Sequence, residues 1–370
     1  MERQHILLVV AVLAIGGIAM VQAGGAVPFT EKDLETEASL WKLYEKWRGV
    51  HTVSRDLAEK KAKFEVFKKN AAYVHEFNGR KDKTYKLGLN RFADMTLDEF
   101  KKKYTGAKPV NRNAVKPKYM GSKVADGDVP DSFDWRDYGA VTPVKDQGQC
   151  GSCWAFSGTE SVESINAIVT GNLLSLSEQQ VLDCSGAGNC EDGGQTSGVF
   201  EYAMQTGLAL DCNYPPYEAA DDQCRIDYSK TPMVKIDGYD AVPANNEQAL
   251  KYRVYLQPVS VHIEASYDLM LYQEGVFAGD CGTYLDHAVV AVGYGVTQDG
   301  VRYWIVKNSW GDQWGEGGYI RMIRDIGAKE GICGIAMYPI YPIKNCPCSP
   351  AIGDSAAAHP KRAGVAKDEL

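Results

Sequence analysis

The segment at residues 147–156 constrains this chain more than any other, because it places a cysteine at the start of an expected helix. It reads QGQCGSCWAF, and the expected helix begins at Cys153, runs to about Thr170 and stops at Gly171. Backbone N–H groups without partners point outward from the start of a helix, and their field stabilises a thiolate. Because the thiolate is the form of cysteine that attacks a carbonyl carbon, Cys153 is a candidate nucleophile.

Three polar residues elsewhere supply the groups that a cysteine nucleophile needs. His287 lies 134 residues after Cys153, and as an imidazolium beside the thiol it would lower the thiol pKa. Asn308 follows 21 residues later, and its carbonyl can accept the other ring N–H of the histidine. Gln147 can donate its side-chain amide to a developing oxyanion, with the backbone N–H of Cys153 as the second donor. Each residue alone is a weak signal, whereas the full set in this order and spacing is a strong one.

The string CGSCW at residues 150–154, with a histidine and an asparagine about 130–150 residues later, resembles the signature of the papain and cathepsin family. The resemblance covers residues 37–342 and includes three further segments: PDSFDWR (130–136), LSEQQ (176–180) and NSWG (308–311). It implies a cysteine endopeptidase in which Cys153 is the nucleophile, His287 the general acid and base, and Asn308 the residue that orients His287. Gln147 would be the oxyanion donor, and Trp310 would shield the His287–Asn308 contact from water. Protein and peptide substrates are implied, without metal or cofactor.

The order of patterns predicts an α+β fold. Steps of three and four between apolar residues indicate helix over 38–80, whereas three short runs rich in β-branched residues indicate strands at 259–263, 287–292 and 303–306. The family resemblance implies two lobes, one helical and one like a β-barrel, with the active-site cleft between them and an α-helical propeptide. We expect four parts: a signal peptide (1–23), an inhibitory propeptide (24–128), a papain-like peptidase domain (129–345) and a C-terminal tail (346–370).

Both ends of the chain carry addresses of the secretory pathway. An apolar run at 6–20 precedes Val21-Gln22-Ala23, which predicts signal-peptide cleavage after Ala23. The alternative is a membrane anchor, but the run is short for a span of about 20 residues, so no stable membrane insertion is expected once the signal is removed. The chain ends in KDEL at 367–370, an endoplasmic-reticulum retrieval signal. We expect the reticulum lumen or vesicles derived from it, then a vacuole-like or lysosome-like compartment, and by resemblance the KDEL receptor as a partner.

The segment before the peptidase domain carries a signature of its own. Six residues stand at spacings of 4, 4, 3, 4 and 4 and resemble the inhibitory propeptide of cathepsin-L-like enzymes: Glu59, Lys63, Phe67, Asn70, Val74 and Asn78. The string GLNRFAD at 88–94 matches a second propeptide motif. An ordinary helix with an apolar stripe explains Phe67 and Val74 but not the two asparagines. The resemblance implies that the propeptide folds separately, lays its following strand through the cleft and inhibits its own enzyme.

Charge is divided unevenly between these two parts. Residues 24–128 hold 23 basic and 15 acidic residues, a net +8, and residues 129–345 hold 13 basic and 29 acidic residues, a net −16. The two parts can attract each other, and the attraction would weaken as carboxylates become protonated. We therefore expect acid-triggered release of the propeptide and cleavage near Asp128, within a Lys-, Gly- and Pro-rich linker at 107–128. The alternative is two solvated surfaces of different composition. No nucleic-acid partner is expected, because the lysines lack interleaved aromatics.

The ten cysteines leave an odd number once Cys153 is set aside as the nucleophile. By resemblance, three disulfides are implied: Cys150–Cys190, Cys184–Cys224 and Cys281–Cys333. The remaining cysteines are Cys212, Cys346 and Cys348, and the last two flank a single proline and are poorly placed to pair with each other. Either could pair with Cys212, and the sequence leaves that choice open.

Residues that line the substrate-binding cleft are also implied by resemblance. They are Gly193, Gly194, Gln195, Thr196, His262, Leu285, Ala288 and Tyr338. His262 departs from the small apolar residue that is usual at its position, and Tyr338 stands at the base of the second specificity pocket. Either the pocket is still apolar but smaller, or it accepts polar and acidic side chains when His262 is charged.

Two other functions compete with the peptidase interpretation. Cys150 and Cys153 form a C-x-x-C pair, and the KDEL tail suits a disulfide oxidoreductase of the reticulum, but no βαβ pattern precedes the pair. The second competitor is a non-catalytic binding protein that retains the fold. Such a protein typically loses the cysteine or the histidine, and this chain has both. Cystatin-like inhibitors are expected partners by resemblance, and the enzyme is expected to be a monomer.

Overall fold

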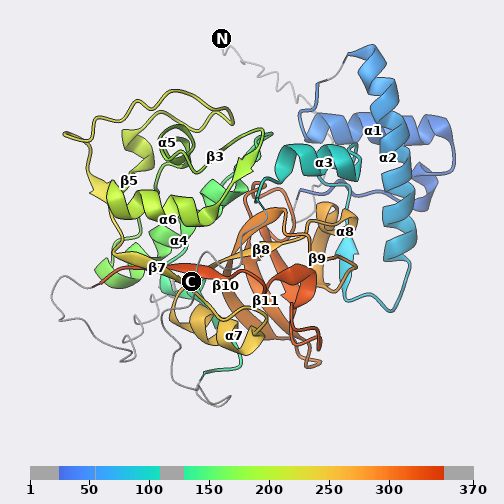
Figure 1. The fold of residues 1–370 in the computed structure, drawn as a ribbon. Helices are drawn as coiled ribbons and strands as arrows, with labels where there is room; N and C mark the ends of the chain where they lie inside the picture. The colour runs from blue at the N-terminus through green and yellow to red at the C-terminus, as the bar shows by residue number, and fades with distance from the viewer. Residues whose placement is uncertain (1–24, 55, 109–128, 346–370) are drawn as a thin grey trace, which may run out of the picture.

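The structure, a computed structural model, describes residues 25–54, 56–108 and 129–345. The signal peptide, the C-terminal tail and the cleavage site expected near Asp128 lie outside the described residues. Three parts lie side by side in Figure 1: blue propeptide helices, green helices of one lobe, and an orange and red sheet of the other lobe. The fold is therefore α+β, as the sequence predicts.

The propeptide contains two long helices where the sequence predicts one helical stretch. They are α1 (Glu37–Val50) and α2 (Leu57–Asn78), and they are followed by β1 (Tyr85–Leu87) and α3 (Leu97–Tyr104). The break has a local cause, because Asp56 caps α2 by accepting a hydrogen bond from the backbone N–H of Glu59. Thr36 and Thr96 cap α1 and α3 in the same way.

The two asparagines of the propeptide signature bind main-chain groups. The amide of Asn70 donates to the carbonyls of Ala93 at 2.8 Å and Met95 at 3.0 Å, so it holds the loop before α3. Asn78 donates to the carbonyl of Leu87 at 2.8 Å and accepts from its N–H at 3.0 Å, so it fixes β1 against α2. Both asparagines thus satisfy backbone groups that would otherwise lack partners, which a stripe of apolar packing alone cannot do.

The helical lobe is built around α4 (Cys153–Thr170), which is buried over most of its length. It ends at Gly171, whose φ of 76° is accessible to glycine at little cost. Around it lie α5 (Glu178–Cys184) and α6 (Thr196–Gln205), with the short strand pairs β3 (Gly188–Asn189) with β4 (Gly193–Gly194) and β5 (Leu208–Ala209) with β6 (Met233–Val234).

The second lobe is a mixed sheet with the order β1-β9-β12-β11-β10-β8-β13-β7. Its strands are β7 (Gly238–Ala241), β8 (Val259–Ile263), β9 (Tyr272–Phe277), β10 (His287–Val296), β11 (Arg302–Lys307), β12 (Tyr319–Ile323) and β13 (Ile340–Ile343), with β2 (Phe133–Asp134) beside β10. Helices α7 (Glu247–Leu256) and α8 (Tyr267–Met270) complete it. The propeptide strand β1 extends this sheet by pairing antiparallel with β9.

The propeptide and the sheet lobe share one hydrophobic core. Phe92 and Phe100 of the propeptide contact the ring of Trp310 at centroid distances of 5.8 and 4.9 Å, and Tyr85 contacts Phe277 at 4.9 Å. The helical lobe has a separate core around Trp154. Release of the propeptide would therefore expose apolar surface on the sheet lobe. Among the described residues, none of the helices is both long and apolar enough to span a bilayer.

Candidate active site

Cys153 is the first residue of α4 and lies at the boundary between the two lobes. Its thiol forms no disulfide and is fully buried. The backbone N–H of Ala288 donates to the sulfur at 3.5 Å, and the nearby backbone N–H groups of Gly106 and Trp154 also act to lower the pKa of the thiol. Ala288 comes from β10 of the sheet lobe and Trp154 from α4, so both lobes contribute donors that would stabilise a thiolate.

His287 is the first residue of β10 and is held in one orientation by its neighbours. Its Nε2 lies 2.8 Å from Oδ1 of Asn308, and its ring stacks on Trp310 at a centroid distance of 4.4 Å. Trp310 is fully buried, so the His287–Asn308 hydrogen bond is shielded from water. Nδ1 of His287 is buried and has no hydrogen-bond partner among the described residues. That nitrogen is thus free to exchange a proton with a group beside it.

A buried ion cluster fixes the end of β11, directly before Asn308. The ammonium of Lys307, the last residue of β11, pairs with Glu160 of α4 and donates to the carbonyl of Thr142 at 2.7 Å. Lys145, in the loop before α4, pairs with the neighbouring Glu163 of that helix at 2.8 Å. The bonds of Lys307 join α4 to β11, so they limit relative movement of Cys153 and Asn308.

Gln147 lies in the loop before α4 and is fully buried. Its Oε1 accepts from the hydroxyl of Ser309 at 2.6 Å. The other end of the amide meets two carbonyl oxygens, which can only accept, so that end is Nε2. That Nε2 donates to the carbonyl of Cys150 at 2.8 Å and to the carbonyl of Tyr104 at 3.2 Å. Tyr104 belongs to the propeptide, so the amide expected to bind an oxyanion is here bound to a propeptide carbonyl.

The propeptide segment after α3 runs through the cleft. The N–H groups of Gly106 and Ala107 donate to the carbonyl of Asp286 at 3.0 and 2.9 Å. Gly194 donates to the carbonyl of Gly106 at 2.8 Å and accepts from Lys108 at 3.0 Å, and Ala107 forms a parallel bridge with Gly194. The linker predicted from Ala107 therefore starts later, because Ala107 and Lys108 belong to this bound segment.

The bound segment covers the thiol of Cys153. Ala107 packs in one apolar cluster with Cys153 and Ala288. Burial raises the pKa of the Cys153 thiol to about 12 and lowers the pKa of His287 to about 4. Burial beneath the propeptide therefore favours the neutral forms of both groups.

Ion pairs across the propeptide surface follow the charge division of the sequence. Lys101 pairs with Asp286 at 2.9 Å, and Lys86 pairs with Glu274 at 2.8 Å. Arg91 pairs with Asp146. In each pair the propeptide supplies the cation and the peptidase part the anion. The sequence suggested an attraction between the two parts, but it could not identify these partners, because they lie far apart in the chain.

Of the residues expected to line the cleft, Gly193, Gly194 and Ala288 contact the bound segment. Gly193 and Gly194 form β4, and a Cβ atom at Gly193 would lie 1.9 Å from the carbonyl oxygen of Gly106. Below them, Oγ1 of Thr196 lies 3.2 Å from Nε2 of His262, and the His262 ring stacks on Tyr338 at 5.2 Å. The other expected lining residues are Leu285 and Ala288, which are buried, and Gln195, which is half-buried.

Within the part of the chain that the structure describes, three disulfides form: Cys150–Cys190, Cys184–Cys224 and Cys281–Cys333. Because Cys150 is bonded to Cys190, it is not available to form a redox pair with Cys153. Cys212 is exposed and forms no disulfide with any other described residue. Cys346 and Cys348 lie outside the described residues.

Comparison with known proteins gives the decisive observation. The model of the papain family cysteine proteases matches residues 129–343, and the model of the cathepsin propeptide inhibitor domain matches residues 44–100. The chain belongs to the papain family of cysteine proteases. It is a cysteine endopeptidase made as an inactive precursor with an inhibitory propeptide.

Similar proteins support this family membership over nearly the whole length of the chain. The chain is 51% identical to the thiol protease SEN102 of Hemerocallis sp. over 366 residues, which covers 97% of this chain and 98% of the relative. It is 53% identical to vignain of Ricinus communis, with 87% of this chain and 91% of the relative covered. Among solved structures, the recombinant stem bromelain precursor is 45% identical with a TM-score of 0.77, and covers 82% of this chain and 99% of its own.

Proposed function

We propose that Cys153 and His287 cleave peptide bonds by covalent catalysis once the propeptide has left. The thiol proton passes to Nδ1 of His287, and the sulfur attacks the carbonyl carbon of the substrate. Gln147 and the N–H of Cys153 bind the oxyanion that forms. The imidazolium then donates its proton to the leaving amine, and water hydrolyses the resulting thioester. The observation that carries this proposal is a free thiol at the start of α4 together with a histidine whose Nε2 is held by Asn308. Replacement of Cys153 tests it directly.

We infer that acid weakens the folded structure of the propeptide. Glu99 is a carboxylate whose pKa is shifted in the direction that this effect requires. Glu99 accepts from Lys63 of α2 at 2.7 Å and from the N–H of Thr96 at 2.9 Å, so it joins α2 to the start of α3. Burial would raise the pKa of Glu99, but these bonds outweigh burial and lower the pKa below its ordinary value of 4.5. Its stabilising effect is therefore present above that value and lost as pH falls through the lowered pKa. Burial raises the pKa of Asp286 instead, so Asp286 does not act in this direction.

A Glu99→Gln precursor is expected to process itself at higher pH than the unmodified precursor. Glutamine cannot form the ion pair with Lys63, so the join between α2 and α3 is weak at every pH, and the pH of half-maximal processing should rise by about half a unit. Processing can be followed by gel from neutral pH to about pH 4. Glu35→Gln, an exposed carboxylate of the same propeptide, is the matched control. The same dependence of processing on pH in all three proteins would contradict the role of Glu99. Equally fast processing of the unmodified precursor at neutral pH and at about pH 4 would contradict acid triggering.

We propose that the pocket formed by Thr196, His262 and Tyr338 is small and neutral. Burial and the nearby His287 lower the pKa of His262 to about 3, so the ring carries no charge at moderately acidic pH. The alternative in which a charged His262 attracts acidic side chains is therefore disfavoured.

Substrate preference at this pocket is expected not to change with pH. The test uses a fluorogenic peptide library that varies the second residue on the N-terminal side of the cleaved bond. The ranking of side chains at this position should be the same at about pH 4.5 and 7, because His262 stays neutral at both. Asp or Glu rising in the ranking at the lower pH would contradict this expectation.

We propose that the chain enters the secretory pathway and is retrieved to the endoplasmic reticulum before delivery to an acidic compartment. Its sequence ends in KDEL, and one relative, 44% identical over 362 residues, is named a KDEL-tailed cysteine endopeptidase of Arabidopsis thaliana. The KDEL receptor, cystatin-like inhibitors and a monomeric state belong to the same proposal. A chain that lacks residues 367–370 should leave the reticulum faster in a pulse-chase experiment. Unchanged residence would contradict retrieval.

A further inference from the structure

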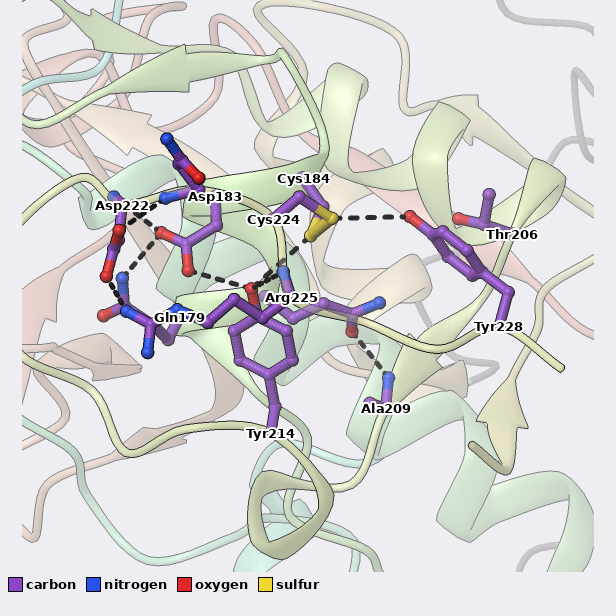
Figure 2. The surroundings of a disulfide bond; sticks show 12 residues. Gln179, Asp183, Cys184, Thr206, Ala209, Tyr214, Asp222, Cys224, Arg225 and Tyr228 are labelled. Carbon is purple, nitrogen blue, oxygen red and sulfur yellow. Dashed lines mark hydrogen bonds and ion pairs between the residues drawn. A yellow bond between two sulfur atoms is a disulfide. The ribbon is translucent and has the colours of Figure 1, made fainter. Parts of the chain in front are cut away.

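A loop of the helical lobe, residues 211–225, is anchored firmly at its base. The disulfide Cys184–Cys224 joins it to α5, as Figure 2 shows. The hydroxyl of Tyr214 donates to Asp183 at 2.9 Å, and the N–H of Asp222 donates to the same carboxylate at 3.0 Å. These bonds fix the path of the loop toward the segment that precedes Cys153.

Tyr217 of this loop contacts that segment at two points. Its hydroxyl lies 2.9 Å from the carbonyl oxygen of Gln147 and 2.6 Å from Oγ of Ser152, and its ring meets Phe156 edge-on at 4.9 Å. A tyrosine hydroxyl has one proton, and a carbonyl can only accept. Tyr217 therefore donates to Gln147, and Ser152 must donate its own proton to the oxygen of Tyr217.

The position of Ser152 makes this contact significant. Ser152 is the N-cap of α4, but its side chain makes no capping hydrogen bond. A serine N-cap ordinarily accepts from the N–H of the second or third helical residue. Here the third, Ala155, already donates to the carbonyl of Ser152 at 2.8 Å, whereas the N–H of the second, Trp154, lies near the sulfur of Cys153 and acts to lower the pKa of that thiol. A capping Ser152 hydroxyl would thus compete with the sulfur for the N–H of Trp154.

We propose that Tyr217 is a positioning residue for catalysis, which holds the hydroxyl of Ser152 away from the start of α4 and so reserves the N–H of Trp154 for the thiolate of Cys153. The same hydroxyl fixes the main chain of Gln147, whose side chain is the proposed oxyanion donor. This inference rests on the proposed role of Cys153 as nucleophile. It assigns to the 211–225 loop a function in catalysis beyond support of the helical lobe.

The test uses acid-activated enzyme with the variants Tyr217→Phe, Ser152→Ala and both together. Phenylalanine keeps the ring against Phe156 and removes only the hydroxyl. In Tyr217→Phe, the pKa of Cys153 from the pH dependence of alkylation by iodoacetamide should rise by about half to one unit, because Ser152 can turn to cap Trp154. The kcat should fall about 5- to 20-fold with little change in KM. In the Ser152→Ala background the alkylation shift should disappear, because no hydroxyl remains to compete.

Tyr228→Phe is the matched control. Tyr228 follows the 211–225 loop, and its hydroxyl contacts the hydroxyl of Tyr202 at 3.0 Å and the sulfur of Cys224 at 3.8 Å. It should leave the alkylation pKa unchanged. Two results would overturn the proposal while leaving Cys153 as the nucleophile. One is an unchanged pKa of Cys153 in Tyr217→Phe, and the other is a shift of that pKa by Tyr217→Phe that is equally large in the Ser152→Ala background. A Cys153 that resists alkylation in unmodified activated enzyme would overturn the assignment of the nucleophile itself, and the proposal with it.

Discussion

Replacement of Cys153 by alanine is expected to abolish peptide hydrolysis, with a loss of kcat on the order of 10⁵-fold or more, because removal of a covalent nucleophile leaves only binding and oxyanion stabilisation. The variant precursor should also fail to process itself in acid. It should still fold, because the change removes one sulfur atom from a buried position, at a cost of about 1 kcal/mol of unfolding free energy. Activity is measured on a fluorogenic peptide, and folding by thermal unfolding.

Cys212→Ala is the matched control for this experiment. Cys212 is the other free cysteine among the described residues, and it is exposed on the 211–225 loop. Its loss should leave hydrolysis unchanged. Activity retained by Cys153→Ala, or lost in Cys212→Ala with the fold intact, would contradict the assignment of the nucleophile.

A Gly106→Ala precursor is expected to be active before processing. A Cβ atom at this position would lie 2.0 Å from the carbonyl oxygen of Gly151 and 2.5 Å from its carbonyl carbon. Both are backbone atoms, so the propeptide segment must move out of the cleft. Overpacking of this kind costs about 1–3 kcal/mol, which corresponds to about a 5- to 150-fold weaker occupancy of the cleft. Peptide hydrolysis by freshly purified precursor at neutral pH is the measurement.

Gly49→Ala is the control for Gly106→Ala. Gly49 lies in α1 of the same propeptide, and a Cβ atom there would meet nothing within 4 Å. That precursor should stay silent at neutral pH. A Gly106→Ala precursor that is equally silent would show that the cleft is closed by something other than the 105–108 segment.

The sequence predicts best those features that depend on neighbouring residues or on fixed spacing. The helix from Cys153 to Thr170 and the strand from Val259 to Ile263 have the predicted bounds, because a helix stop and a β-branched run are local signals. The break between α1 and α2 was missed, since the apolar spacing continues through it. Asp56 followed three residues later by Glu59 was the available sign of a new helix start.

Contacts between distant segments could not be predicted in the same way. The carbonyl of Tyr104 on Gln147, the ion pair of Lys101 with Asp286 and the bond of Tyr217 to Ser152 each join residues that no local pattern connects. The effect of the propeptide on the Cys153 thiol is a further example. Sequence predicts a stabilised thiolate at a helix start, whereas burial beneath the propeptide raises the thiol pKa. That burial depends on a segment distant in the chain, so no local pattern reveals it.

The most direct test of this account is to locate the site of a thiol-directed epoxide by mass spectrometry, before and after acid activation. Two solved relatives carry the inhibitor E-64, among them bromelain of Ananas comosus, which is 50% identical and covers 59% of this chain. We predict an adduct on Cys153 in the activated enzyme, in amounts that match the loss of activity, and none on Cys153 of the intact precursor at neutral pH. An activated enzyme that is inhibited without an adduct on Cys153, or a precursor labelled there as readily as the activated enzyme, would contradict it.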